Sequence, residues 1–424
     1  MKKNILMIIV EDFGRHLEDI PEKSKFINNL IKSGLTFNNV FTTGSTCSVS
    51  RSSIMTGHYP HTINSQNHRY GNKHPLPEGI KSLPKILKDN GYATAIVGKQ
   101  DVNYVEDADW DIIPPVGPAV HRDLPESKPF FVMYNLGLTH EFALIKESDP
   151  VDNQPFYDYY IKNIIERKKK FVNNINVDEI RIPPYIPDCL TEYLQEHYML
   201  LSYEDHSVKA IVEALLMDGK YKDTIIILLS DHGRPFPRCK REVYDSGTQI
   251  WLTIFDESSN FHNMRCDNLV SSVDIAPSIL KYVGIDVPDY LENYDIFDTS
   301  ISRKYVFSSK DRVQEYVTKV RAIRSKDHKL IWNAQENIVM NKDGNVTLMP
   351  TYIKTLEAYQ NSKLTEIQDD YLFKPRPEWE FYDLKSDPDE INNLIDKEEY
   401  YAIIEEMKSE LFKHIQKTEK KDSE

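Results

Sequence analysis

The sequence predicts an α/β protein in which a large, mostly parallel sheet is sandwiched by helices and followed by a smaller antiparallel sheet with one closing helix. Two observations predict this architecture. Up to residue 304, apolar runs rich in β-branched residues alternate with segments of helical period, which is typical of parallel sheets covered on both faces. From Tyr305 onward the apolar segments are short and alternating, and turn residues separate them. We therefore expect a main domain at residues 1–304 and a C-terminal α+β subdomain at residues 305–424.

Continuous apolar runs mark the expected strands of the main sheet, because a strand buried on both faces shows no polar alternation. These runs are Ile5–Val10, Ala93–Val97, Phe130–Tyr134 and Thr224–Leu229. Apolar residues at helical spacing, each group followed by a glycine, predict helices at Glu22–Ser33, Lys81–Asn90 and Glu192–Leu216. In sheets of this kind, functional sites lie beyond the carboxyl ends of the strands.

The C-terminal subdomain is expected to consist of short strands and one helix. The strands are Tyr305–Ser308, Val317–Ile323, Lys329–Trp332, Asn345–Met349 and Glu380–Leu384. An amphipathic pattern from Lys397 to Gln416 predicts the closing helix. The polar stretch Lys146–Pro187 is expected to be a solvated surface excursion.

Composition excludes several classes of protein. With 52 Lys and Arg against 66 Asp and Glu, the formal net charge is −14, which argues against a nucleic-acid partner that needs a basic surface. It does not exclude an anionic small substrate, because one local basic pocket can lie on an acidic surface. The four cysteines, Cys47, Cys189, Cys239 and Cys266, are too few and too scattered for a disulfide framework or a zinc site.

The chain start is not typical of an export signal. The apolar run after Met1-Lys2-Lys3 ends at Glu11-Asp12 without a small-residue cleavage site. No segment reaches the roughly 20 apolar residues of a membrane span. We therefore expect a cytoplasmic protein with no membrane partner.

Polar side chains follow three of the expected strands. Glu11 and Asp12 follow the first strand, Asp231 and His232 follow the Thr224–Leu229 run, and Lys99 comes shortly after Ala93–Val97. Adjacent carboxylates at the ends of two strands form a hard-oxygen cluster suited to a divalent cation. Either pair alone is equally well explained as a helix cap or a solvated turn, but the two together favour a metal site.

The turn from Thr42 to Gly57 carries a second chemical signal. Cys47 lies among small hydroxyl residues, with Arg51 four residues later, and a helix is expected to begin there. A nearby cation and a helix N-terminus both lower a thiol pKa and favour an anion. The residues alone thus indicate an anion-handling turn with a reactive cysteine.

CSVSR, which begins at Cys47, and the SSIMTG that follows it resemble the signature of the sulfatases, a family of the alkaline-phosphatase superfamily. The resemblance covers nearly the whole chain. NILMIIVEDFG, GYATAIVGK and LLSDHG resemble the family's first metal strand, lysine strand and second metal strand, and SSVDIAPSILKYVGI resembles a family helix. SDHGRPFPRCK, YVGIDVP and the WEFYDLKSDPDEINNL ending are most similar to N-sulfoglucosamine sulfohydrolases (sulfamidases).

The resemblance implies a role for individual residues. A divalent cation, Ca²⁺ in most relatives with Mg²⁺ or Mn²⁺ as alternatives, would be held by Glu11, Asp12, Cys47, Asp231 and His232. A maturation enzyme would convert Cys47 to formylglycine, whose hydrate is the nucleophile, and Arg51 would support that hydrate. The sulfuryl group would be bound or protonated by Lys99, His140 and Lys240. Arg241 is the alternative to Lys240.

Three positions depart from the family pattern. Val49 stands where substrates of the maturation enzymes have Pro or Ala. Asp101 stands where relatives have His, so it either accepts from a substrate hydroxyl or amine or points away. Glu11 replaces the usual Asp, and His232 replaces the common Asn.

The stretch after the signature is rich in polar side chains that either line the substrate pocket or belong to an ordinary polar loop. They are His58, His61, Asn67, His68, Arg69 and His74. The leading hypothesis is a hydrolase that releases sulfate from the ester or sulfamate of a sulfated saccharide, with N-sulfoglucosamine as one candidate. The alternatives are a phosphodiester or phosphonate ester hydrolase on the same scaffold, or a catalytically degenerate protein that binds glycans.

Overall fold

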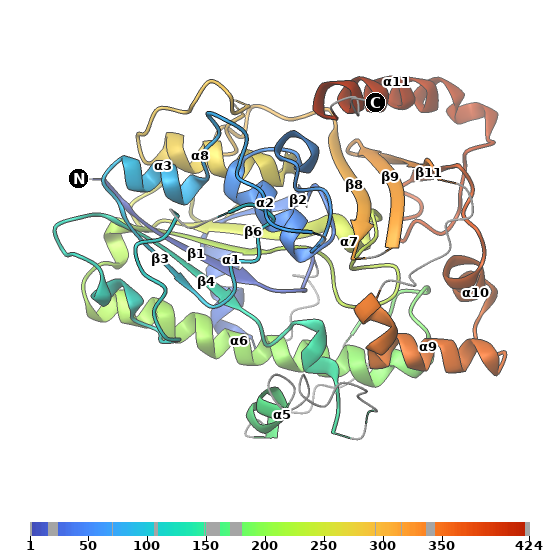
Figure 1. The fold of residues 1–424 in the computed structure, drawn as a ribbon, viewed down its shortest axis with the longest axis horizontal. Helices are drawn as coiled ribbons and strands as arrows, with labels where there is room; N and C mark the ends of the chain where they lie inside the picture. Colours follow the sequence, from blue (N-terminus) through green and yellow to red (C-terminus); the bar gives the residue numbers. More distant parts are fainter. Residues whose placement is uncertain are drawn as a thin grey trace.

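The computed structural model describes residues 2–15, 24–69, 71–105, 109–147, 149, 162–169, 180–292, 294–314, 316–335 and 344–419. Within them the chain forms a seven-stranded sheet and a four-stranded sheet, with helices above and below the larger one (Figure 1). The predicted fold class is confirmed. The proposed domain boundary between residues 304 and 305 remains a prediction.

The large sheet has the order β3-β4-β1-β5-β6-β2-β7. Its strands are β1 Asn4–Val10, β2 Leu35–Phe41, β3 Ala93–Val97, β4 Phe130–Leu136, β5 Thr224–Ser230, β6 Gln249–Phe255 and β7 Met264–Ser271. The central strand β1 pairs in parallel with β4 and β5, whereas β6 runs antiparallel to both of its neighbours. The four predicted strands are all present. The sequence patterns did not predict β2, β6 or β7.

Helices cover both faces of this sheet. On one side lie α1 Lys25–Ser33 and α6 Thr191–Met217, and on the other lie α2 Cys47–Thr56, α3 Leu83–Asp89 and α8 Ile275–Tyr282. Two further helices, α5 Lys162–Lys169 and α7 Asp245–Thr248, lie away from these faces (Figure 1). Successive residues of β1 alternate between two cores: Leu6 and Ile8 pack with the α1 and α6 side, and Ile5 and Met7 pack with the α2, α3 and α8 side. The helix expected at Glu22–Ser33 begins at Lys25, and the segment 16–23 lies outside the described residues.

The small sheet is antiparallel, in the order β11-β10-β9-β8. Its elements are β8 Val306–Val313, β9 Tyr316–Arg324, β10 His328–Asn333, β11 Trp379–Asp383, α9 Pro350–Gln360, α10 Glu366–Phe373 and α11 Tyr401–Thr418. The predicted closing helix α11 buries Ile404, Met407 and Leu411 against this sheet (Figure 1). The helices α9 and α10 had no clear signal in the sequence.

Two expectations are corrected. The strand expected at Asn345–Met349 is wrong, because residues Gly344–Leu348 form a 3₁₀ turn. The Met349 N–H closes on the Val346 carbonyl at 2.9 Å, and Pro350 then starts α9, so the local turn and helix start outweigh a short alternating pattern. The expected surface excursion at 146–187 is wrong for its last part, since Ile180 and Tyr185 are buried in the core beside α6, whereas Glu147 and Glu166 are exposed. Residues 148, 150–161 and 170–179 of that stretch lie outside the described residues.

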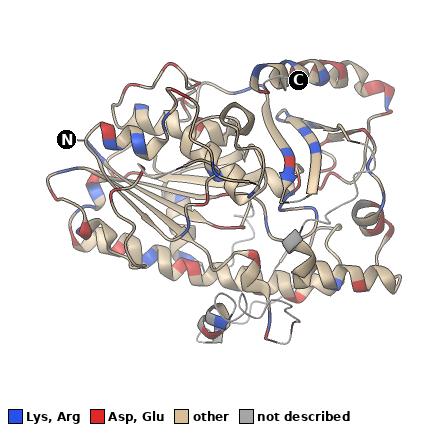
Figure 2. Cartoon of the chain, viewed as in Figure 1, with Lys and Arg blue, Asp and Glu red and all other residues tan. Residues whose placement is uncertain are grey.

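Buried ion pairs join the two sheets. Asp245, at the start of α7, contacts Lys329 Nζ at 2.8 Å and Arg324 Nη2 at 3.2 Å. Lys310 Nζ of β8 contacts Glu242 Oε1 at 3.1 Å. Lys310, Arg324 and Lys329 lie on β8, β9 and β10, and Figure 2 shows that basic residues occur along β8 and β9. Among the described helices, none combines the length and apolar character needed to cross a bilayer.

We predict that Asp245→Ala lowers the free energy of unfolding by about 3 kcal/mol or more, because buried Arg324 loses its carboxylate partner and buried Lys329 keeps only Glu390, at 3.3 Å. The measurement is chemical denaturation followed by far-UV circular dichroism. The matched control is Asp370→Ala, which removes an ion pair with Lys374 whose side chains are 51% and 57% exposed, and is expected to cost less than about 1 kcal/mol. Equal stability losses in the two variants would contradict this prediction.

Candidate active site

Two neighbouring strand ends bring the acidic residues together. β1 and β5 pair in parallel, so their carboxyl ends lie at the same edge of the sheet. Glu11 and Asp12 follow β1, Asp231 and His232 follow β5, and all four side chains are buried. The Asp12 backbone is left-handed at φ 55°, and its N–H donates to Asp231 Oδ1 at 3.0 Å. The two acidic pairs predicted from the sequence therefore meet.

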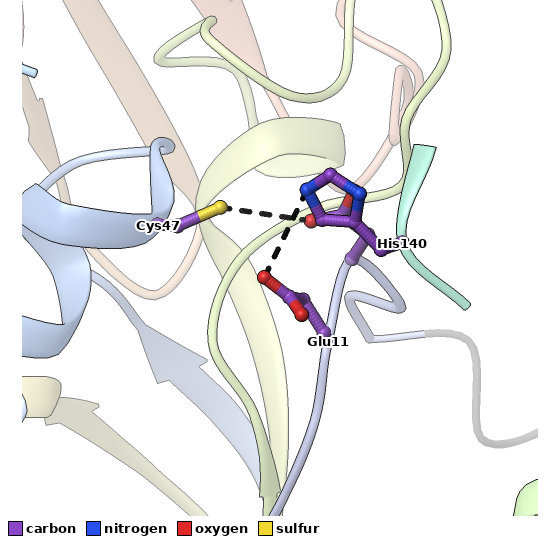
Figure 3. Close-up of side chains that lie close together, drawn as sticks. Glu11, Cys47 and His140 are labelled. Atoms are coloured by element: carbon purple, nitrogen blue, oxygen red, sulfur yellow. Dashed lines mark hydrogen bonds and ion pairs between the residues drawn. The ribbon is translucent and has the colours of Figure 1, made fainter. Parts of the chain in front are cut away.

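The helix α2 directs Cys47 at this edge. Cys47 is the first residue of α2, where backbone N–H groups without helical partners favour negative charge. Its Sγ lies 3.2 Å from His232 Nε2 and 3.9 Å from Asp12 Oδ1. Figure 3 shows the thiol pointing from the helix start towards Glu11 and His140, which lie 3.9 Å apart between Oε1 and Nε2. Residue 47 thus stands beside the carboxylate cluster.

Hydroxyl groups fix the turn before α2. Thr42 Oγ1 donates to Ser50 Oγ at 2.7 Å, and Ser50 Oγ donates to the Asp231 carbonyl at 2.5 Å. These bonds connect the turn to the end of β5. Val49 packs against the same turn, since a Cβ added to Gly44 would lie 2.6 Å from Val49 Cγ1. The residue that departs from the family pattern therefore fills space beside a glycine.

Two fully buried cations neutralise the carboxylates. Arg51 donates from Nε and Nη2 to Asp231 Oδ2 at 3.1 and 3.0 Å. Lys240 Nζ donates to both oxygens of Asp12, at 2.9 and 2.7 Å. Charge-assisted bonds of this kind are strong, and they offset the cost of burying the ions.

The site opens to solvent at Lys99. Its Nζ is hydrogen-bonded to Glu11 Oε1 and lies 3.1 Å from Asp101 Oδ2. The Lys99 side chain is 28% exposed and that of His140 is 11% exposed, whereas Arg51 and Lys240 are at most 2% exposed. Asp101 does not point away from the site, because it contacts this lysine.

The loop after β5 brings Lys240 rather than Arg241 to the cluster. Arg241 forms a fork with Glu141, with nitrogen–oxygen distances of 2.9 and 2.8 Å. The loop closes tightly on itself: a Cβ on Gly247 would lie 2.2 Å from two backbone carbonyls, and one on Gly233 would lie 2.1 Å from another. Only glycine fits these positions, so the backbone of the loop has little freedom to move.

The surrounding charges favour an anion at residue 47. Burial opposes ionisation, but the Lys240 and Lys99 ammonium groups outweigh it and lower the pKa of the Cys47 thiol to about 6. Burial also disfavours a charged imidazole, yet Asp231 and Cys47 raise the pKa of His232 to about 9. The pocket is built to hold negative charge.

The donor atoms fit a divalent cation. Two overlapping groups each place four donor atoms within 4.8 Å of one another. The groups are Glu11, Asp12, Cys47 and His140, and Asp12, Cys47, Asp231 and His232. Each group contains two carboxylates, with Asp12 in both, and carboxylate oxygens are the ligands that hard divalent cations prefer. The structure thus brings together every predicted site residue, while the role of each remains a prediction.

Sequence reasoning missed two residues of the site. Asn135 Oδ1 accepts from Arg51 Nη2 at 2.5 Å, and its Nδ2 donates to Glu11 Oε2 at 3.2 Å. Asn135 lies at the end of β4, so the strand-end argument used for Glu11 could have found it. Glu141 accepts the Arg241 fork, but its position after His140 gave no signal of that role. The histidines that follow the signature, His58, His61, His68 and His74, lie outside both donor groups.

Comparison with known families now adds to this geometry. The sulfatase family model matches residues 3–110 and 119–285, more than half of the chain. The chain belongs to the sulfatase family. A further model, for the C-terminal part of N-sulphoglucosamine sulphohydrolase, matches residues 370–417. The resemblance noted at Cys47 is confirmed, and the chain is an enzyme of the sulfatase class.

Characterised relatives align with almost the whole of this sulfatase. An ulvan-active sulfatase of Formosa agariphila is 27% identical over 445 residues, covering 97% of this chain and 74% of the relative. Human N-sulphoglucosamine sulphohydrolase is 24% identical over 479 residues, covering 97% and 89%.

Solved structures share the fold of this sulfatase. A protein in complex with its substrate D-glucosamine-2-N,6-O-disulfate has a TM-score of 0.65 at 14% identity, covering 99% of this chain and 98% of that one. A 2-O glycosaminoglycan sulfatase has a TM-score of 0.67 at 16% identity, covering 99% and 93%. At these identities the likeness shows the fold.

We predict that a divalent cation stabilises chelator-treated protein by about 2–3 kcal/mol when its concentration is roughly a hundred times Kd. Asp231→Asn removes one carboxylate charge and should abolish most of this gain. The measurement is the rise in unfolding temperature on adding the cation, with Asp370→Asn as the exposed control. An equal rise in both variants, or none in the wild type, would refute metal binding at the cluster.

Proposed function

We propose that this sulfatase hydrolyses the sulfate ester or sulfamate of a sulfated saccharide and releases inorganic sulfate. The observation that carries the proposal is the place of Cys47. Cys47 is the first residue of α2 and lies beside the carboxylates of two strand ends. Its Sγ is 3.9 Å from Asp12 Oδ1, and the same oxygen accepts from Lys240 Nζ, whose side chain is only 2% exposed. A nucleophile between a metal site and fixed cations suits transfer of a negatively charged sulfuryl group.

The proposal includes a formylglycine made from Cys47 by a maturation enzyme and a bound cation, Ca²⁺ first, with Mg²⁺ or Mn²⁺ as alternatives. When present, formylglycine would supply an oxygen nucleophile, and the cation would draw charge from a sulfuryl oxygen. The cation would be held by Glu11, Asp12, residue 47, Asp231 and His232.

The chain's own cations would bind the sulfuryl group from two sides. Lys240 approaches residue 47 from the buried loop after β5, and Lys99 approaches it from the open side. Their ammonium groups would hold sulfuryl oxygens and neutralise charge that develops as the bond to sulfur breaks. His140 lies at the same opening, so its imidazole is placed to give a proton to the departing oxygen or nitrogen. Arg51 would keep Asp231 in position.

Relatives support a saccharide substrate. The family model for the C-terminal part of N-sulphoglucosamine sulphohydrolase and the human relative of that name make N-sulfoglucosamine the first candidate. The ulvan-active relative also acts on a saccharide by its name.

The phosphonate alternative is not favoured. A phosphonate monoester hydrolase shares the fold with a TM-score of 0.64, but at 14% identity it carries no functional argument. The degenerate alternative is not favoured either, since the buried carboxylates and cations of the site are all present and mutually paired.

The deciding experiment is release of inorganic sulfate from D-glucosamine N-sulfate and from an aryl sulfate, measured by ion chromatography with an aryl phosphodiester as the competing substrate. We expect sulfate release that Cys47→Ala abolishes, by a factor of about 10³ or more. Cys189→Ala is the control, because Cys189 is exposed and distant in the fold from the cluster. Phosphodiester turnover without sulfate release would refute the proposal.

We further predict that active protein carries an aldehyde at residue 47. Peptide mass spectrometry of protein from the native host should show the thiol-to-aldehyde change in the peptide that contains Val49. Sulfate release by protein whose Cys47 is wholly unmodified would contradict the formylglycine assignment while leaving the activity itself intact.

A further inference from the structure

A second guanidinium lies at the opening of the site, outside the residues assigned above. Arg69 donates from Nη2 to Asp101 Oδ2 at 2.7 Å and from Nε to Asp101 Oδ1 at 3.3 Å. The same Asp101 Oδ2 lies 3.1 Å from Lys99 Nζ, which in turn is hydrogen-bonded to Glu11. A continuous chain of ion pairs therefore leads from the carboxylate cluster to Arg69.

Among the residues joined by these ion pairs, Arg69 is the most exposed to solvent. The Arg69 side chain is 36% exposed, against 13% for Asp101, and the innermost cations Arg51 and Lys240 are almost completely buried. A guanidinium has five N–H donors, and a fork with one carboxylate uses only one edge of the plane. The rest of the Arg69 plane can meet a ligand that enters the site.

The backbone on both sides of the fork is held firmly. Nδ1 of His68, the residue before Arg69, is hydrogen-bonded to Ser48 Oγ at 2.7 Å. The His68 backbone N–H donates to the Arg312 carbonyl of β8 at 2.7 Å. This ties Arg69 both to the residue after Cys47 and to the small sheet. A surface arginine without a function needs no such framework.

Asn103 holds the other half of the fork in the same way. Its backbone N–H donates to Ser52 Oγ of α2 at 2.9 Å, and its Nδ2 donates to the carbonyls of Ser65 and Asn67 at 2.8 and 3.0 Å. The loop that carries Asp101 is thereby joined to the loop that carries Arg69. The fork is pre-organised, so little side-chain entropy is lost when a ligand binds it.

We propose that Arg69 binds a second anionic group of the saccharide, a sulfate or a carboxylate, next to the sulfuryl group held at residue 47, and that Asp101 is its positioning residue. This inference rests on the proposed function and names its substrate class: a sugar with at least two negative charges. The chain as a whole is acidic, with a net charge of −14, so a doubly anionic ligand needs a local cation at each of its charges. Lys99 and Lys240 serve the first anion, and Arg69 serves the second.

The test is a set of affinities measured by isothermal titration calorimetry in the Cys47→Ala background, which has no nucleophile at residue 47, so that no probe is turned over. The probes are D-glucosamine-2-N-sulfate, with one anion, and two doubly anionic sugars, D-glucosamine-2-N,6-O-disulfate and an unsaturated uronyl-N-sulfoglucosamine disaccharide. Arg69→Ala should weaken at least one doubly anionic probe by about tenfold or more and the singly anionic probe by less than about twofold. The sugar affected tells whether the second anion is a sulfate or a carboxylate.

Arg122→Ala is the matched control, because Arg122 forms a similar exposed fork with Asp218 at 2.7 and 3.0 Å outside the site. It should leave all three affinities unchanged. Arg69→Gln keeps a polar side chain without the positive charge and provides a second variant if the alanine variant unfolds. Thermal unfolding of each variant separates lost binding from lost folding.

Three outcomes would overturn the inference. One is an equal loss for all probes, which would mean that Arg69 holds the sulfuryl group at residue 47. Another is no loss for any probe on removal of Arg69. The third is a parent protein that binds the doubly anionic probes no better than the single one. Aryl sulfate hydrolysis by protein with residue 47 intact is measured separately, so failure of the proposed function is distinguishable from failure of the Arg69 assignment.

Discussion

Charge balance at the carboxyl edge of the large sheet is the constraint on which the rest of this structure depends. Glu11, Asp12 and Asp231 are buried there, and each buried ion costs several kcal/mol unless a partner compensates it. Arg51 and Lys240 supply that compensation from different elements. The tight glycine loop after β5 and the hydroxyl turn before α2 exist to hold these partners within hydrogen-bond distance. A divalent cation would add two further positive charges at the same point.

This arrangement separates two tasks in space. The innermost residues are almost inaccessible to water and fix the place of the reacting group. The outer residues Lys99, Asp101 and Arg69 are more exposed, at 28%, 13% and 36%, and they lie where the rest of the substrate would be. Because a single carboxylate, Asp101, joins the inner lysine to the outer arginine, chemistry and substrate choice are physically linked.

Much of this could be predicted from the sequence, for reasons that are visible in particular elements. Strands such as Ile5–Val10 are buried on both faces and therefore uniformly apolar, and polar residues after them are conspicuous. β2 was missed because Asn38 and Asn39 interrupt its apolar pattern at a register shift, and β7 because its first half is polar. The 3₁₀ turn at Gly344–Leu348 shows that five alternating residues do not outweigh a helix start. The Arg69–Asp101 fork joins residues 32 positions apart, which only the folded chain reveals.

The central claim is that acidic side chains from the ends of β1 and β5 hold one divalent cation beside residue 47. The most direct measurement is a crystal structure of protein loaded with Mn²⁺, with data collected at an energy where manganese scatters anomalously. The account predicts an anomalous peak about 2.0–2.6 Å from carboxylate oxygens of both strand ends, with Lys240 displaced from Asp12. A saturated crystal with no peak there, and with the Lys240–Asp12 and Arg51–Asp231 ion pairs unchanged, would contradict it.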